Sequence, residues 1–206
     1  METFAEKSLT QFSQELYDKT SVPGGGGAAA LVGALSASLC AMAANFTVGK
    51  KKYLVYDSEL HRILDKMDVY RISLLNCIDK DAEGFAPLSN AYSLSKDDPN
   101  RQSVLDKASL LALEAPLEIV KTTGKIIDLL MQSKEMTSRL LLSDIACSAY
   151  LASSALKSAA INVFVNTKVL SDKETANKIN SEVDLYLQKC NNADHLADSI
   201  SKELRG

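Results

Sequence analysis

Apolar residues recur at helical spacing along most of the chain, with polar residues between them. The longest series follows Tyr53 and comprises Leu60, Leu64, Met67, Leu74, Ile78, Ala82 and Phe85. These steps place the side chains near one face of an α-helix. Pro87 and the polar segment 96–100 interrupt the pattern, so we expect a long amphipathic helix followed by a loop.

A further helical series contains a proline. Its apolar members are Val104, Ala108, Leu111, Ala115, Ile119 and Ile126. Pro116 lacks the backbone N–H that a helix interior needs, so we expect it to kink or divide this helix.

Two capping-box spacings mark the expected first and last helices. The first pair is Thr3 and Glu6, and the second is Ser171 and Glu174. The apolar faces that follow are Leu9, Phe12 and Leu16 in the first case, and Ala176, Ile179, Val183, Leu187 and Cys190 in the second. Each pair can satisfy two N–H groups at a helix start, and therefore predicts an N-terminus.

Two segments are nearly free of charge and rich in alanine and serine. Residues 20–49 carry no charged side chain, and residues 143–169 carry three. A helix without a polar face is typically buried on all sides, so both segments are interpreted as fully buried helices. The first has small residues at helical spacing, which let another backbone come close: Gly33, Ala37, Ala41 and Ala44.

The first of these segments is also long enough to raise the question of a membrane span. It begins with glycines and mixes Ser36, Ser38 and Asn45 with alanine rather than leucine. Such a composition transfers weakly into lipid, so we favour a buried helix and expect no membrane partner.

The fold class follows from these patterns and from what is missing. No segment alternates as a strand does, and the sequence contains no Asn-Gly or Asp-Gly hairpin signal and no repeat of fixed period. We expect one all-α domain, residues 1–206, forming a bundle of about six helices with two buried small-residue helices. The other four helices would hardly cover both, so we expect a homodimer; tight packing within one chain is the alternative.

The charge composition of the chain argues against some classes of partner. The net charge is −3, and the only run of basic residues is Lys50–Lys52, so the clustered positive charge that nucleic acid requires is lacking. The N-terminus, Met1–Glu6, carries acidic residues where a secretory signal carries basic and apolar ones. We therefore expect no nucleic acid partner and a cytoplasmic location.

The cysteines and histidines give no sign of metal or redox chemistry. Cys40, Cys77, Cys147 and Cys190 form no CxxC pair, which predicts buried reduced thiols. His61 and His195 lack a second ligand at helical spacing, so a metal site is not expected and surface histidines are.

A run of four glycines, Gly24–Gly27, follows Pro23 and opens the first uncharged segment. Glycine loses more conformational freedom on folding than any other residue, which indicates close approach of a ligand or of another helix. At a helix start, the backbone N–H groups favour an anion or a carbonyl oxygen. Tight packing at the helix start without a ligand is the alternative.

Acidic and basic residues supply the remaining candidates. Asp144, after Ser143, either caps a helix or is a partly desolvated carboxylate. Asp79 and Asp81 lie two residues apart on the long helix, so at most one faces the core. Lys50–Lys52 either neutralise a helix C-terminus or hold a polyanionic substrate tail.

Several of these features occur together in a known family. They are Pro23–Gly26, the small-residue helix, Gly49–Tyr53, Asp81 with Phe85, Ala115–Leu117, Ser143–Asp144, and Ala159–Val163 with Asn166. In this order, over nearly the whole chain, they resemble the formiminotransferase-cyclodeaminase family, specifically its cyclodeaminase and methenyltetrahydrofolate cyclohydrolase domain. That family is all-helical and dimeric. One departure is Gly27, where the family usually has serine.

The resemblance implies a reduced folate substrate, possibly polyglutamylated, and no cofactor. It implies a free-standing module whose formiminotransferase, if any, is a separate chain. In cyclodeamination, N10 attacks the formimino carbon on N5 and ammonia leaves; in cyclohydrolysis, water attacks the resulting methenyl bridge. We rank cyclodeamination slightly first, and a non-catalytic folate-binding or scaffold dimer is the alternative of another class.

Both reactions move protons beside a delocalised cation, which suits a partly buried carboxylate. We nominate Asp144 first and Asp81 second as catalytic residues. The glycine run would bind pterin or glutamate oxygens, and Lys50, Lys51 and Lys52 the folate glutamates. Asn162 and Asn166 would present amides to the pterin, or else satisfy buried backbone groups.

Overall fold

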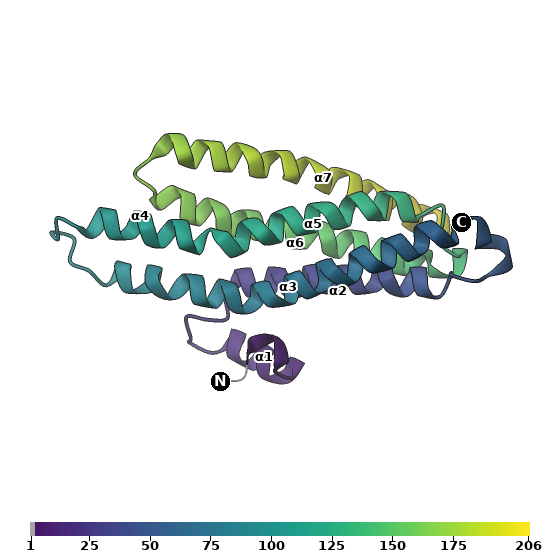
Figure 1. Cartoon of the computed structure of the whole chain (residues 1–206), viewed down its shortest axis with the longest axis horizontal. Coiled ribbons are helices and arrows are strands. Elements are labelled where there is room, and N and C mark those ends of the chain that lie inside the picture. The colour runs from purple at the N-terminus through teal and green to yellow at the C-terminus, as the bar shows by residue number, and fades with distance from the viewer. Residues whose placement is uncertain (1–2) are drawn as a thin grey trace.

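The computed structural model describes residues 3–206, so Met1 and Glu2 of the acidic N-terminus lie outside it. Six long helices form an elongated bundle (Figure 1). They are α2 (Gly25–Asn45), α3 (Asp57–Tyr92), α4 (Arg101–Ala112), α5 (Glu114–Ser133), α6 (Leu142–Val169) and α7 (Lys173–Arg205). Shorter elements are α1 (Leu9–Tyr17) and the 3-10 turns η1 (Phe4–Glu6), η2 (Lys51–Tyr56) and η3 (Arg139–Leu141). No strand occurs in residues 3–206, which confirms the all-α class.

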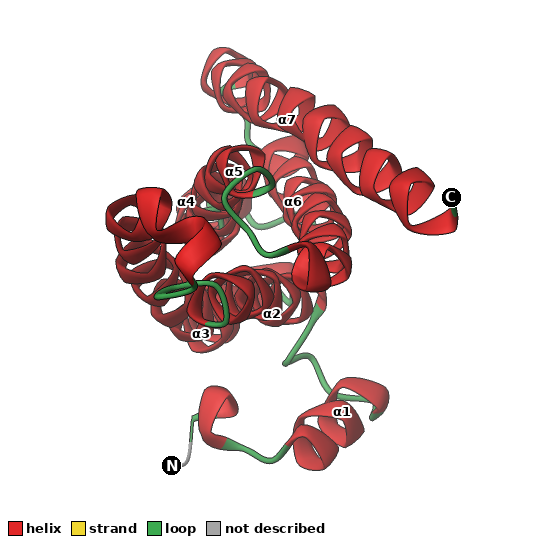
Figure 2. Cartoon of the chain, turned by 90° about the vertical axis from the view of Figure 1, so that its right-hand side faces the viewer, coloured by secondary structure: helices red, strands yellow, loops and turns green. Residues whose placement is uncertain are grey.

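The bundle is organised around α2, which packs against both α3 and α6 (Figure 2). A Cβ on Gly33 would lie 3.0 Å from a methyl group of Leu74 and 3.3 Å from the Thr123 hydroxyl, so the small-residue face does permit close approach. Between α2 and α6, Ser36 and Ser148 each donate a hydroxyl hydrogen bond to the other's carbonyl oxygen, at 2.8 and 2.7 Å. These buried bonds fix the register of the two helices.

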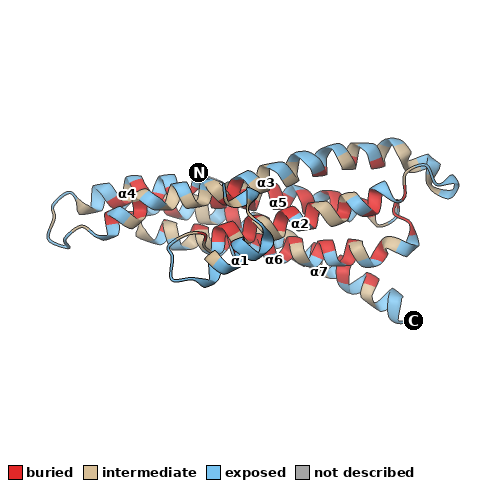
Figure 3. Ribbon diagram, turned by 90° about the horizontal axis from the view of Figure 1, so that it is seen from below, coloured by how far each residue is buried: buried red, intermediate tan, exposed pale blue. Residues whose placement is uncertain are grey.

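Both small-residue helices are mostly buried, but the expectation that they are fully buried was wrong. Leu35 and Met42 on α2, and Ile161 and Val165 on α6, are exposed. The burial pattern shows one buried side and one outer strip on each helix (Figure 3). Gly25–Asn45 is the one helix in residues 3–206 with the length and hydropathy of a membrane span, and 56% of its most apolar window is buried inside the bundle.

Of the two helix breaks predicted at prolines, one is confirmed and the other was wrong. Pro116 divides the predicted helix as expected, because α4 ends at Ala112 and α5 begins at Glu114. The break expected at Pro87 was wrong, since α3 continues through it to Tyr92. Tertiary packing holds this turn helical: Leu88 and Ala91 beyond the proline are buried against α4. The loop is therefore shorter than predicted.

The predicted capping boxes were only partly right. Glu6 does accept the Thr3 N–H, but this box starts η1; α1 has a separate box from Ser8 and Gln11. Only Phe12 of its expected apolar face is buried, whereas Leu9 is 74% exposed. Lys7 and Ser8 have extended backbone between η1 and α1, so the two short elements do not form one continuous helix.

At the last helix, the N-cap is Asp172 rather than Ser171. The Asp172 carboxylate accepts the Thr175 N–H at 3.0 Å. Ser171 is instead held by Asp106 of α4, which accepts its N–H at 2.8 Å. This tertiary contact takes Ser171 away from the helix that its spacing predicted it would cap.

Two glycines on the outer helices give a matched test of this packing. A Cβ on Gly124 would lie 2.5 Å from the Tyr186 ring, whereas one on Gly84 would meet nothing closer than 3.4 Å. We expect Gly84→Ala to stabilise the fold by about 0.5–1 kcal/mol through helix propensity. Gly124→Ala should destabilise it, because overpacking costs about 1–3 kcal/mol. Thermal melts check both, and an equal rise in Tm for the two variants would contradict the packing.

Candidate functional site

The glycine run forms the start of α2. Gly24 is the N-cap, and α2 begins at Gly25. The first N–H groups of a helix have no intrahelical acceptor. The Gly27 N–H is satisfied by the Asp81 carboxylate of α3, at 3.1 Å, while no partner within residues 3–206 takes those of Gly25 and Gly26. Of these two, Gly25 is exposed and Gly26 is buried, so the Gly25 N–H remains available at the positive end of the helix dipole.

Asp81 depends on the absence of a side chain at Gly26. A Cβ on Gly26 would overlap the Asp81 carboxylate, so only glycine permits this approach. Burial raises the pKa of Asp81 above its ordinary value, and the hydrogen bond from the Gly27 N–H opposes part of that rise. The other acid of the pair, Asp79, faces the N-terminal segment, where it accepts the Phe4 N–H at 2.7 Å. Only Asp81 of the two lies at the glycine turn.

Two asparagines of α6 complete this arrangement. The Asn162 amide donates to the Ser158 carbonyl oxygen at 2.9 Å, and the Asn166 amide donates to the Ala112 carbonyl oxygen at 3.1 Å. Each side chain thus uses its NH₂ group on backbone, and its Oδ1 atom is left as an acceptor. Satisfying backbone and presenting an amide oxygen, which the sequence left as alternatives, occur in the same side chains.

These groups surround a cavity of about 150 Å³. It is lined by Ser21, Val22, Gly24, Gly25, Asp81, Phe85, Ala112, Asn162, Val165 and Asn166. Pro23 is buried beside it, with its Cβ 3.6 Å from where a Cβ of Gly27 would lie. Sequence reasoning named Asp81, the glycines and the asparagines, but did not name Ser21 or Val165 as site residues. Helical spacing carried the signal for Val165, three residues after Asn162.

Other predicted site residues lie at the opposite end of the bundle. Lys50–Lys52 follow the C-terminus of α2, and the 21 residues of this helix span about 30 Å. Asp144, in the first turn of α6, lies 18 positions before Asn162, or about 27 Å along the helix. Lys50 Nζ donates to Ser138 Oγ at 3.3 Å. Within one chain, the structure brings neither the lysines nor Asp144 to the glycine turn.

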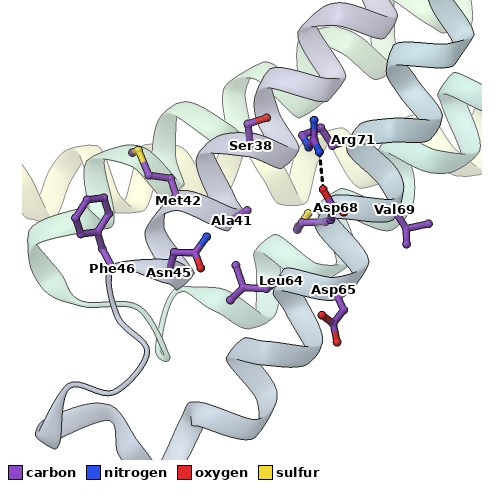
Figure 4. Close-up of a pocket in the computed structure, with 11 residues that line it drawn as sticks. Ser38, Ala41, Met42, Asn45, Phe46, Leu64, Asp65, Asp68, Val69 and Arg71 are labelled. Atoms are coloured by element: carbon purple, nitrogen blue, oxygen red, sulfur yellow. Dashed lines mark hydrogen bonds and ion pairs between the residues drawn. The ribbon is translucent and has the colours of Figure 1, made fainter.

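A larger hollow lies elsewhere, in a groove of about 970 Å³ between the second half of α2 and the first half of α3 (Figure 4). Met42 and Phe46 project from the α2 side, and Val69 is on α3. Arg71 and Asp68 form an ion pair there at 2.6 Å. The groove contains none of the predicted site residues and no buried ionisable group, so its size alone does not make it the catalytic site.

The cysteine and histidine side chains of residues 3–206 do not line the cavity at Asp81. Burial raises the pKa of both Cys40 and Cys77 to about 12, so these thiols stay protonated and poorly nucleophilic. Cys190 is also buried, but Cys147 is exposed, where burial had been predicted. His61 and His195 are exposed, as expected for surface histidines.

The site at the glycine turn has a definite chemical character. Gly25 offers an N–H donor on one side, and Asp81, Asn162 and Asn166 offer oxygen acceptors on the other. A ligand that fits must present both a carbonyl-type acceptor and N–H donors. A carboxylate with a raised pKa can also take up and return a proton at a reacting nitrogen.

Comparison with known proteins places this arrangement in a family. The family model described as formiminotransferase-cyclodeaminase matches residues 8–185. A methenyltetrahydrofolate cyclohydrolase from Methylorubrum extorquens is 34% identical over 82% of this chain and 84% of its own length. The formimidoyltransferase-cyclodeaminase of Rattus norvegicus is 27% identical over 91% of this chain, which spans only 36% of the rat protein.

A solved structure agrees with the sequence comparisons. The formiminotetrahydrofolate cyclodeaminase of Thermotoga maritima superposes with a TM-score of 0.89, covering 97% of this chain and 98% of the other, at 25% identity. The family model covers most of the chain, and the fold matches over nearly its whole length. The chain belongs to the formiminotransferase-cyclodeaminase family.

Proposed function

We propose that this chain is a folate-dependent one-carbon enzyme, a cyclodeaminase that converts 5-formiminotetrahydrofolate to 5,10-methenyltetrahydrofolate with release of ammonia. The observation that carries the proposal is the partly buried Asp81 carboxylate at the glycine turn, within a chain of this family. Methenyltetrahydrofolate cyclohydrolase activity is the second candidate. It is favoured by the cyclohydrolase from Methylorubrum extorquens, which aligns over most of both chains.

Asp81 is assigned the proton transfer. In cyclodeamination, N10 attacks the carbon of the protonated formimino group, Asp81 accepts the N10 proton, and the proton passes to the resulting NH₂ group, which leaves as ammonia. The carbon is left bonded to both N5 and N10 as a methenyl cation. In cyclohydrolysis, Asp81 accepts a proton from the water that attacks this carbon, the bond to N5 opens, and one proton is released overall. The carboxylate also stabilises the positive charge of the bridge.

The surrounding groups match the pyrimidine edge of a reduced pterin. That edge presents one carbonyl oxygen beside a ring N–H and an amino group. We assign the carbonyl oxygen to the N–H group of Gly25, and the pterin N–H donors to the Oδ1 atoms of Asn162 and Asn166. Pro23, Gly24 and Gly27 shape the turn that holds the Gly25 N–H in place.

We further propose a homodimer. The cavity at Asp81, about 150 Å³, is smaller than the roughly 300–1,000 Å³ of ordinary ligand sites, so another surface must cover the rest of the folate. The groove between α2 and α3 leaves Met42, Phe46 and Val69 exposed, which supports a second copy there. A monomer mass in light scattering would contradict this assignment.

A second copy also provides a role for the distant residues. Asp144 remains the other catalytic candidate, and Lys50, Lys51 and Lys52 the candidates for the glutamate tail of a polyglutamylated folate. Both groups lie too far along the bundle to reach Asp81 of their own chain, so their roles require the site of a neighbouring copy. Asp144→Asn should lower turnover if this is so, and unchanged turnover removes Asp144 from the mechanism.

The remaining assignments follow from the chemistry. Ring closure and ammonia loss need only proton transfer, so we propose no cofactor beyond the folate and no metal. The free, buried thiols of Cys40, Cys77 and Cys190 support a cytoplasmic location. Neither nucleic acid nor membrane is a proposed partner.

The test is near-ultraviolet absorbance of the purified protein with each substrate, against the uncatalysed rate. Appearance of the methenyl chromophore from 5-formiminotetrahydrofolate identifies the cyclodeaminase. Accelerated loss of the chromophore from 5,10-methenyltetrahydrofolate identifies the cyclohydrolase. Thermal protection by methenyltetrahydrofolate without turnover of either compound would instead indicate a non-catalytic folate-binding protein.

Asp81→Asn should separate activity from stability. Loss of the proton acceptor is expected to lower turnover by about 10²–10⁴-fold. Because burial raises the folded-state pKa of Asp81, ionisation costs stability as pH rises through that pKa. The Asn variant should therefore be as stable as, or more stable than, the parent at pH 7, with its advantage shrinking toward the acid side. Melts at several pH values and the absorbance assay measure both effects.

Neighbouring glycines provide a sharper test of geometry. Gly26→Ala should displace the Asp81 carboxylate and lower turnover strongly. Gly27→Ala is the control, since its Cβ would lie 3.5 Å from the nearest side-chain atom, an ordinary contact. Gly27→Ser should be tolerated for the same reason. Equal turnover in the Gly26 and Gly27 alanine variants would show that the approach of Asp81 to the turn does not matter.

A further inference from the structure

Pro116 leaves one carbonyl oxygen without its ordinary helical partner. It occupies the third position of α5. On either side the helical bonding continues: the Leu113 N–H bonds the Ser109 oxygen at 3.0 Å, and the Leu117 N–H bonds the Leu113 oxygen at 3.1 Å. The next carbonyl back from Leu113 belongs to Ala112, and its partner four residues on is Pro116, which has no N–H.

The Ala112 carbonyl oxygen instead accepts a hydrogen bond from a side chain of the site. The Asn166 side chain of α6 donates to the Ala112 carbonyl oxygen at 3.1 Å. Ala112 is 7% exposed, and both residues line the cavity at Asp81. An unpaired buried carbonyl costs free energy, so the vacancy created by the proline favours an amide donor from the neighbouring helix.

This bond orients the amide. A carbonyl oxygen can only face the NH₂ end of Asn166, so the Oδ1 end is directed away from Ala112. Asn162 differs, because its NH₂ group bonds the Ser158 oxygen four residues earlier in its own helix. Asn166 alone of the two is oriented by a second element.

We propose that Pro116 is a positioning residue of the site. By withholding an N–H from Ala112, it reserves that carbonyl for Asn166 and holds the Asn166 Oδ1 atom ready for an N–H donor of the bound pterin. The inference rests on the proposed function for the identity of the ligand. The orientation of Asn166 itself does not depend on that identity.

Pro116→Ala restores an N–H that competes with Asn166 for the Ala112 oxygen. Replacing proline within a helix should leave the fold at least as stable. With whichever folate the parent turns over, KM should rise about 3- to 10-fold at little change in kcat, since one ground-state hydrogen bond is weakened. An unchanged KM would overturn the proposal, as would a fall in kcat alone.

Pro87→Ala is the matched control. Pro87 also lies inside a helix, but the carbonyl it leaves open, that of Glu83, is bonded by no side chain in the described residues. Its KM should stay at the parental value. In an Asn166→Ala background, Pro116→Ala should have no further effect on KM; a rise equal to that in the parent would show that Pro116 acts by another route.

Nuclear magnetic resonance of the side-chain amides separates this inference from the proposed function. The Asn166 NH₂ protons should exchange faster in the Pro116→Ala variant than in the parent and the Pro87→Ala control. Unchanged exchange refutes the role of Pro116 even if the enzyme is active. If the parent turns over neither folate, the proposed function fails while faster exchange still supports the orienting role.

Discussion

The close approach of α2 to α3 is the constraint on which the rest of the site depends. Asp81 can reach the first turn of α2 only because Gly26 has no side chain, and Gly27 then donates its N–H to the carboxylate. The same hydrogen bond ties the two helices together at the end where the cavity lies. The contact of Asp81 with Gly26 and Gly27 therefore serves both helix packing and the proposed chemistry, so a substitution there is expected to affect both.

The electrostatic balance at this contact is a compromise. Burial disfavours the charged form of Asp81, whereas the Gly27 N–H and the helix dipole favour it. A fully solvated aspartate would have a pKa well below the operating pH, which makes it a weaker general base than one whose pKa is raised. A fully buried carboxyl group without a donor would stay protonated. The half-buried position leaves a carboxylate whose proton affinity is raised but still opposed.

Much of this architecture was predictable from sequence, and the failures have physical causes. Helical periodicity gave the class and the division at Pro116, and the glycine run gave the start of α2. Pro87 was misjudged because burial of Leu88 and Ala91 outweighs the lost hydrogen bond. Ser171 was misjudged because Asp106, far away in sequence, binds it. Local pattern contains no information about such distant partners.

For the site too, the sequence predicted residue types better than their positions relative to one another. Asp81, the glycines and the asparagines were recognisable as candidates, but their proximity was not, and Lys50–Lys52 and Asp144 were expected beside them. A linear motif does not show that α2 spans about 30 Å, or that about 27 Å of α6 separate Asp144 from Asn162. The hydrogen bond from Asn166 to Ala112 likewise depends on the packing of α4, α5 and α6, which no single segment of sequence shows.

The apolar surface of α2 has a consequence for synthesis on the ribosome. Its neighbour α6 begins at Leu142, almost 100 residues after α2 ends at Asn45. At about 5–20 residues per second, α2 waits on the order of 5–20 s before that partner is translated. During this interval its alanine-rich surface must be shielded by α3, later by α5, which also packs against α2, or by a chaperone. The hairpin of α2 and α3 is thus the first unit of the nascent chain able to hide it.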